Sequence, residues 1–138
     1  EETIGNTFGT DNVIVNNNIG IDLQTNKPLS TNITQNLIYG NVYNLRIDPG
    51  ISATPDAPVI ESVDLGGMVS GIACPHCLVE IFSGQGTGTE YFEGRVFADS
   101  EGNFRLTVEG PFTYQTLIAT TTSPSGITSE FSQPVTGD

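Results

Sequence analysis

The motif Cys74-Pro75-His76-Cys77 has the residues most suited to chemistry. Thiol oxidases use this C-x-x-C spacing, in which the start of a helix and the histidine lower the pKa of the first thiol. Here the motif is followed by Leu-Val-Glu-Ile-Phe-Ser-Gly, which predicts a strand. Two cysteines and one histidine also give zinc only three ligands. The sequence favours a structural disulfide at a turn between strands, with a CPHC thiol oxidoreductase or a metal site as alternatives. An oxidised pair predicts an extracytoplasmic compartment.

A second candidate is the acidic run Asp99-Ser-Glu101-Gly102-Asn103. Calcium binds such oxygen-rich clusters, so Asp99 and Glu101 are candidate calcium ligands. The run is much shorter than a twelve-residue calcium loop and lacks its terminal glutamate. A hairpin turn, in which Gly102 adopts positive φ, is therefore favoured over a metal site. We expect no other cofactor.

Catalytic constellations are not recognisable elsewhere in the chain. Glu90 and Glu93 are three apart on a predicted strand, so their side chains point to opposite faces and do not form a glycosidase pair. The only histidine, His76, lies between two cysteines and leaves no Ser-His-Asp candidate. The sequence therefore predicts a protein that is not an enzyme.

Composition narrows the class of partner. Sixteen acidic residues against four basic ones give a net charge of −12, which argues against binding nucleic acid. No apolar run approaches the length of about 18 residues that a membrane span needs. Sixteen glycines and eight prolines leave little room for long helices. These features indicate an extracellular or cell-surface β-protein, secreted and with its signal sequence already removed.

Ten of the eleven asparagines lie in the first 45 residues. Asn12 and Asn16 recur twenty positions later as Asn32 and Asn36, and a fixed period of this length predicts the coils of a solenoid. Coils of a parallel β-helix stack about 4.8 Å apart. We therefore expect amide ladders in which Asn12 lies over Asn32 and Asn16 lies over Asn36. Two coils are fewer than the roughly three that a stable solenoid needs.

Three regions follow from the pattern: β-helix coils over 1–48, a Pro-rich linker over 49–57 and a β-sandwich over 58–136. The proline-rich linker is expected to be extended and semi-rigid. Turn residues separate short apolar segments in the last region, as in a sandwich. The expected strands are 59–63, 68–73, 78–82, 91–97, 104–108, 114–121 and 128–135. The fold class is all-β throughout.

Several segments resemble the C-terminal region of bacterial secreted or surface right-handed parallel β-helix proteins that end in an immunoglobulin-like sandwich. The segments are 19–23 and 36–41 in the coils and 57–60, 69–83, 98–104, 118–122 and 125–132 in the sandwich. Ile127 stands where asparagine is usual. The resemblance implies adhesion, spacing or assembly without catalysis, and supports a disulfide between Cys74 and Cys77.

The leading functional hypothesis is an extracellular structural protein that self-associates through the open edge of its coils, into a filament or a surface assembly. The alternative is a carbohydrate-binding or surface-binding module of a larger secreted β-helix protein. Four tyrosines are its candidate platforms for stacking on an extracellular polysaccharide: Tyr39, Tyr43, Tyr91 and Tyr114. We expect neither nucleic-acid binding nor insertion into a membrane.

Overall fold

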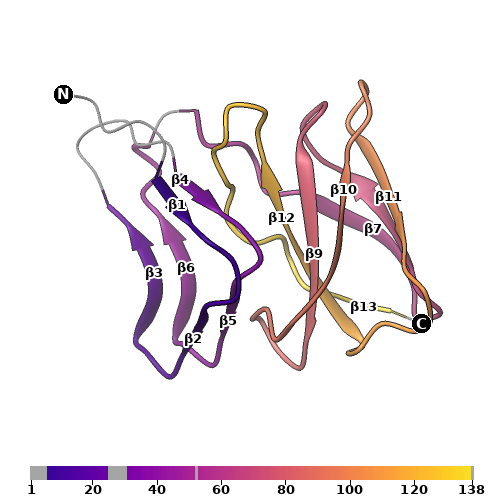
Figure 1. The fold of residues 1–138 in the computed structure, drawn as a ribbon, viewed down its shortest axis with the longest axis horizontal. Coiled ribbons are helices and arrows are strands. Elements are labelled where there is room, and N and C mark those ends of the chain that lie inside the picture. The colour runs from indigo at the N-terminus through magenta and orange to yellow at the C-terminus, as the bar shows by residue number, and fades with distance from the viewer. Residues whose placement is uncertain (1–5, 25–30, 52, 138) are drawn as a thin grey trace.

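A computed structural model describes residues 6–24, 31–51 and 53–137. Every regular element in this part of the chain is a β-strand, as the sequence predicts. Figure 1 shows three layers: parallel strands from the first third of the chain, then one antiparallel sheet, then a second antiparallel sheet. The described residues include no helix of the length and apolarity that a membrane crossing requires.

The first third of the chain forms three parallel sheets of two strands each. β1 (Asn6–Phe8), β2 (Val13–Val15) and β3 (Ile19–Leu23) form a first strand triplet. β4 (Thr31–Ile33), β5 (Leu37–Tyr39) and β6 (Tyr43–Ile47) form a second strand triplet. Each strand of the first triplet pairs with its counterpart in the second: β1 with β4, β2 with β5 and β3 with β6.

The period of this stack is 24 residues at β2/β5 and β3/β6 and 25 residues at β1/β4, so the expected period of twenty is wrong. Val13 pairs with Leu37 and Ile19 with Tyr43. Residues with left-handed backbone mark equivalent corners in the two triplets. Asp11 (φ 66°) and Gln35 (φ 50°) occupy one corner, and Asn16 (φ 63°) and Gly40 (φ 63°) occupy the next. Asparagine, aspartate and glycine tolerate this conformation best, so these corners, rather than matching Asn-x-x-x-Asn letters, mark the repeat.

The remainder of the chain forms two antiparallel sheets. The four-stranded sheet has the order β10-β9-β12-β13, and the three-stranded sheet has the order β11-β8-β7. The strand bounds are β7 Val59–Asp64, β8 Met68–Ile72, β9 Leu78–Gly84, β10 Tyr91–Phe97, β11 Asn103–Thr107, β12 Thr116–Thr122 and β13 Val135–Thr136.

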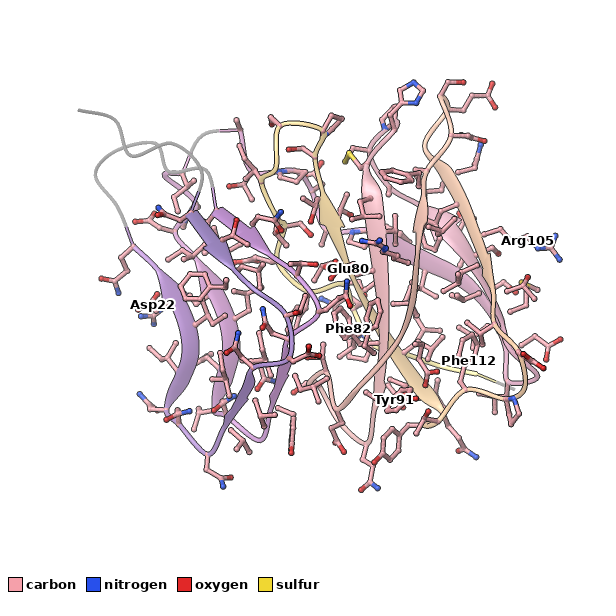
Figure 2. All side chains as sticks on the ribbon, in the orientation of Figure 1. Asp22, Glu80, Phe82, Tyr91, Arg105 and Phe112 are labelled. Carbon is pink, nitrogen blue, oxygen red and sulfur yellow. A yellow bond between two sulfur atoms is a disulfide. The ribbon has the colours of Figure 1, made fainter. Side chains whose placement is uncertain are left out.

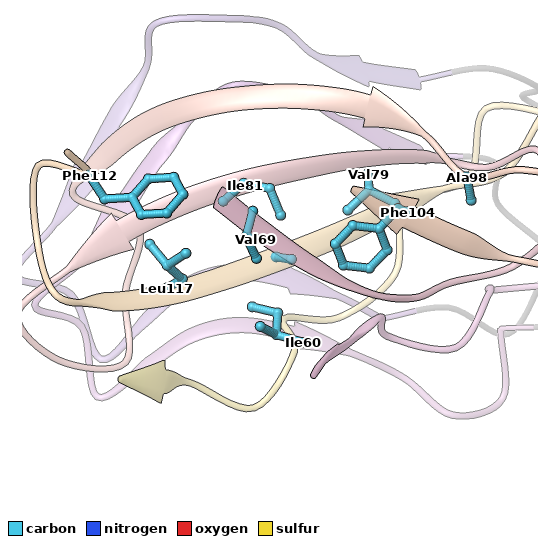
Figure 3. Close-up of a cluster of buried hydrophobic side chains, with 9 residues drawn as sticks. Ile60, Val69, Val79, Ile81, Ala98, Phe104, Phe112 and Leu117 are labelled. Atoms are coloured by element: carbon cyan, nitrogen blue, oxygen red, sulfur yellow. The ribbon is translucent and has the colours of Figure 1, made fainter. Parts of the chain in front are cut away.

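The two antiparallel sheets share one apolar core. Phe104 and Val69 from the three-stranded sheet meet Val79, Ile81 and Leu117 from the four-stranded sheet (Figure 3). All five are at most 3% exposed. Burial of such side chains stabilises each by about 1.5–3 kcal/mol relative to leaving it in water. This core holds the two sheets face to face.

The four-stranded sheet is buried on both faces. Val79 and Ile81 point into the core just described, so the alternate residues Glu80 and Phe82 point to the other face, where they are 0% and 3% exposed. Ile118 and Thr120 on β12 are buried in the same way. The strand triplets cover this second face (Figure 1).

The expected strands agree with the structure except at the end. Residues 128–135 were expected to form one strand, but only Val135–Thr136 is a strand. Between Ile127 and Ser132 the chain still runs beside β12, and serine hydroxyls replace the backbone acceptors. The Ser129 hydroxyl accepts from Thr121 N–H, and the Ser132 hydroxyl accepts from Ala119 N–H, both at 2.9 Å. Because side-chain hydroxyls take the place of backbone carbonyls, this segment does not form the regular backbone ladder of a β-strand.

Candidate assembly site

The first strand triplet has an unpaired edge. Within the described ranges, β1, β2 and β3 each pair with one strand only, on the side of the second triplet. Leu37 N–H donates to Asn12 O in the first triplet. Because Val13 is stacked on Leu37 in register, its own N–H points the same way, out of the edge. Exposed strand edges of this kind template the addition of further strands.

On β1 and β2, apolar side chains are less buried than their counterparts one layer below, whereas on β3 Ile21 is 5% exposed and lies over the half-buried Leu45. Phe8 lies over Ile33, and the two are 42% and 4% exposed. Ile14 is half-buried and lies over Ile38, which is 1% exposed. On β1 and β2 the first triplet therefore covers the apolar side chains of the second, while its own apolar side chains are left partly exposed.

A row of asparagines links the two triplets. Asn12 Nδ2 donates to Asn36 Oδ1 at 2.9 Å, and Asn36 Nδ2 donates to the carbonyl of Phe8 at 3.1 Å. Asn36 is 2% exposed, so these bonds satisfy a buried amide. We call this pair the Asn12 row.

A second row joins Asn17 and Asn41. Asn41 Oδ1 accepts from the backbone N–H of Asn17 at 2.8 Å and from Asn17 Nδ2 at 3.2 Å. Asn41 Nδ2 donates to the carbonyl of Ile14 at 2.9 Å. We call this pair the Asn17 row, and both rows have the 24-residue spacing.

The expected partners within the rows are corrected by this register. Asn12 contacts Asn36 instead of Asn32, which pairs with Thr7. Asn16 lies over Gly40 at a left-handed corner rather than over Asn36. The expected ladders failed because the Asn-x-x-x-Asn spacing of Asn12 and Asn16 recurs at Asn32 and Asn36, although Asn32 lies within β4 and the register between β2 and β5 is 24 residues.

The opposite edge, on the second triplet, is closed by the antiparallel part of the chain. Its three strands each direct one isoleucine N–H at an acceptor there. Ile33 donates to Thr128 Oγ1 at 2.9 Å, and Ile38 donates to the carbonyl of Thr89 at 3.1 Å. Ile47 donates to Glu130 Oε1 at 3.2 Å. We call these three acceptors the cap. Among the residues that the structure describes, one edge of the stack is therefore open and the other is closed.

Glu80 joins the stack to the four-stranded sheet. Its carboxylate accepts hydrogen bonds from the hydroxyl of Thr34 and from the backbone N–H of Gln35, the latter at 3.0 Å. Figure 2 shows Glu80 and Phe82 where the sheet meets the strand triplets. Burial raises the pKa of Glu80, and the bonds from Thr34 and Gln35 oppose this effect. A carboxylate thus fixes the left-handed corner at Gln35.

Asp22 and Arg46 form an ion pair across the two triplets, with 2.6 Å between Asp22 Oδ2 and Arg46 Nη2. The hydrogen bond from Arg46 lowers the pKa of Asp22. The pair is solvent-exposed, so it contributes little to stability, although it follows the same register as the asparagine rows.

Cys74 and Cys77 lie at disulfide distance, with 5.4 Å between their Cα atoms. Cys77 N–H donates to the carbonyl of Cys74, and β9 begins at the next residue, so the motif closes a turn before a strand. His76 is exposed, has a left-handed backbone (φ 60°) and donates its N–H to the carbonyl of Asp99. The helix that would activate a redox thiol is replaced by β9.

Asp99 Oδ1 accepts the backbone N–H groups of Glu101 and Asn103, both at 2.9 Å. These bonds lower the pKa of Asp99. Gly102 has φ 88°, as a hairpin turn requires. Among the described residues, no three carboxylate, histidine or cysteine side chains are placed to hold a metal ion. The calcium alternative at Asp99 and Glu101 therefore gains no support from this geometry.

A shallow hollow between residues 47–57 and Glu130 is the other acidic feature. Asp48 accepts the N–H of Gly50, and Glu130 accepts the N–H of Ile47. Both carboxylates therefore already accept a hydrogen bond from a backbone N–H group. Ile51 is 6% exposed and Pro58 is buried, so this proline-rich stretch packs on the protein.

The four tyrosines do not gather on one sheet. Tyr43 and Tyr91 are exposed, on β6 and β10, while Tyr39 and Tyr114 are half-buried. A flat platform for sugar stacking would need at least two of them in one plane. That these tyrosines bind a polysaccharide therefore remains a prediction.

Comparison with known proteins adds no family. No family model and no curated protein sequence matches this chain.

Sequence reasoning missed Glu80, Thr89, Thr128 and Glu130. One signal was present for Glu80: it interrupts the apolar run Leu78–Phe82, where a solvated strand face would not be expected. The cap residues gave no local signal, because each is 51 to 95 positions from its partner and looks like an ordinary turn or strand residue.

Proposed function

We propose that this chain is a non-catalytic extracellular structural protein that ends a stack of β-helix coils and assembles through the open edge of its first coil. In this proposal, the two strand triplets are coils of a parallel β-helix, and the antiparallel sheets form an immunoglobulin-like sandwich. The observation that carries it is the asymmetry of the stack. The cap occupies one edge at Ile33, Ile38 and Ile47, while β1 to β3 pair with no further strand in the described part of the chain.

The cap also restricts the form of the assembly. A filament built by stacking one copy's first coil on another copy's second coil would have to displace all three cap acceptors. Displacing the cap would also expose the covered face of the four-stranded sheet, where burial of side chains such as Phe82 and Ile118 contributes about 1.5–3 kcal/mol each. We therefore propose finite association through the first coil in place of open-ended growth.

Sedimentation velocity over a wide concentration range tests the proposal. The parent chain should form a finite oligomer, and Val13→Lys at the open edge should weaken it, because an edge lysine opposes strand addition. Val42→Lys is the matched control, since Val42 is 70% exposed and Val13 is 57% exposed. Open-ended polymers, a strictly monomeric parent, or equal effects of the two lysines would contradict the proposal.

A further inference from the structure

The open edge presents the side-chain amide oxygens of two asparagines. The equivalent oxygens one layer below accept hydrogen bonds from the first triplet. Asn36 Oδ1 accepts from Asn12 Nδ2, and Asn41 Oδ1 accepts from the N–H of Asn17. Asn12 and Asn17 occupy the same positions in the first triplet. Their own Oδ1 atoms accept no hydrogen bond from the described residues, whereas their Nδ2 groups all donate downward or locally.

We propose that the open edge binds a further parallel β-coil that has asparagine at the two positions stacked on Asn12 and Asn17. This inference rests on the proposed function and names the partner of its edge. The incoming asparagines would repeat the existing contacts. One would donate its Nδ2 to Asn12 Oδ1, and the other would donate its backbone N–H to Asn17 Oδ1.

The chemistry of the rows selects an amide. Asparagine donates and accepts from one side chain, so a row of identical residues satisfies itself layer after layer. An aspartate at the first position would place a carboxylate against Asn12 Oδ1 without a donor between them. An alanine would leave that oxygen to water. The two triplets already meet through such asparagine rows, so the proposed partner would repeat the contacts that join them.

A second copy of the chain does not supply such a coil. Its second triplet is closed by the cap, so it offers only its own first triplet. Two first triplets facing each other about a two-fold axis would run antiparallel, and the rows of the two copies would not continue one another. A parallel coil fits both the strand direction and the rows.

The experiment is a tandem duplication of residues 7–30 within the full chain, which adds one 24-residue coil over the open edge. Amide hydrogen exchange of Val13 and Val15, measured by NMR, reports pairing at that edge. In the duplicated chain these amides should exchange about tenfold more slowly, or slower still, than in the parent. Alanine at both row positions of the added copy should return their exchange to the parent rate. Alanine at its Asn18 position, exposed and outside the rows, should leave the protection intact.

Each outcome bears on a different claim. Equal protection with and without the added asparagines would overturn the inference and leave the proposed function standing. No protection from the added coil that retains its asparagines would overturn both. The two chains are compared at a concentration at which sedimentation velocity shows the parent to be monomeric, so the finite oligomer of the proposed function does not protect these amides. Protection of the monomeric parent equal to that of the duplicated chain would overturn the inference. Ile81, buried in the core between the antiparallel sheets, should remain protected in every variant, which separates loss of pairing from loss of fold.

Discussion

Glu80 allows a pair of substitutions that separate charge from hydrogen bonding at the joint between the strand triplets and the four-stranded sheet. The side chain is 0% exposed and accepts from Thr34 and Gln35. Glu80→Gln keeps an oxygen for Gln35 N–H and presents an NH₂ donor to the Thr34 oxygen, but it has no charge. Glu80→Ala removes the acceptor of both donors.

The charge effect has a defined sign. Burial raises the pKa of Glu80, so the folded protein binds a proton more tightly than the unfolded chain does. The stability that this gives is fully present below the unfolded pKa, about 4.3, and is lost as pH rises through the higher folded pKa. Glutamine mimics the protonated form at every pH. The stability of Glu80→Gln minus that of the parent should therefore be near zero at pH 4 and rise toward pH 8.

The hydrogen-bonding effect can be sized from the two donors. A buried donor without an acceptor costs about 1–3 kcal/mol. Because Thr34 and Gln35 are half-buried, the lower part of this range applies. Glu80→Ala should thus be about 2–4 kcal/mol less stable than Glu80→Gln, before any cost of the cavity.

Urea unfolding followed by far-UV circular dichroism at pH 4, 6 and 8 gives both differences. The chain has no tryptophan, so tyrosine fluorescence serves as the second probe. Groups other than Glu80 titrate alike in the parent and in Glu80→Gln and cancel in the difference. A difference that is flat with pH would refute the effect of burial on Glu80, and equal stability of the glutamine and alanine variants would refute its role as an acceptor.

Three further predictions concern the rows and the turns. Asn36→Ala should lower the free energy of unfolding by about 1–3 kcal/mol in urea titrations, because it leaves Asn12 and the Phe8 carbonyl without their buried partner, whereas Asn18→Ala should change little. Cys74→Ser should cost about 2 kcal/mol on the chain-entropy model, and a reductant should destabilise the parent equally but leave the variant unaffected. Asp99→Asn should be less stable than the parent above about pH 4, and the gap should close as pH falls through the lowered pKa of Asp99, as thermal unfolding at pH 2 to 7 can test.

Local sequence was a good guide to individual strands. Tyr91–Phe97 is a strand with the expected bounds, and Val59–Asp64 and Met68–Ile72 match their expected bounds to within one residue. These segments are rich in β-branched or aromatic residues, and Pro58 and Gly67 mark where two of them begin. Such signals depend on nearby residues and need no knowledge of the tertiary contacts.

The register between the two strand triplets could not be predicted from local sequence. Asn12 fits Asn32 in sequence and Asn36 in space, and only the left-handed corners at Asp11 and Gln35 distinguish the two. The cap was hidden for another reason. It joins Thr128 to Ile33 and Glu130 to Ile47 over distances of 95 and 83 residues, where one hydroxyl and one carboxylate replace a strand. A contact of that kind leaves no periodic pattern in the sequence from which it could be predicted.

The polarity of the stack follows from the different chemistry at its two edges. Between the triplets, identical groups meet at constant spacing, so the pattern at Asn12 and Asn17 can be repeated by any coil of the same kind. At the cap, the acceptors are a threonine hydroxyl, a backbone carbonyl and a glutamate, which no coil reproduces. The first edge can be extended because its contacts are repeated, and the second cannot because its contacts are unique. Under the proposed function, such a chain ends a stack of β-coils and extends it from a single side only.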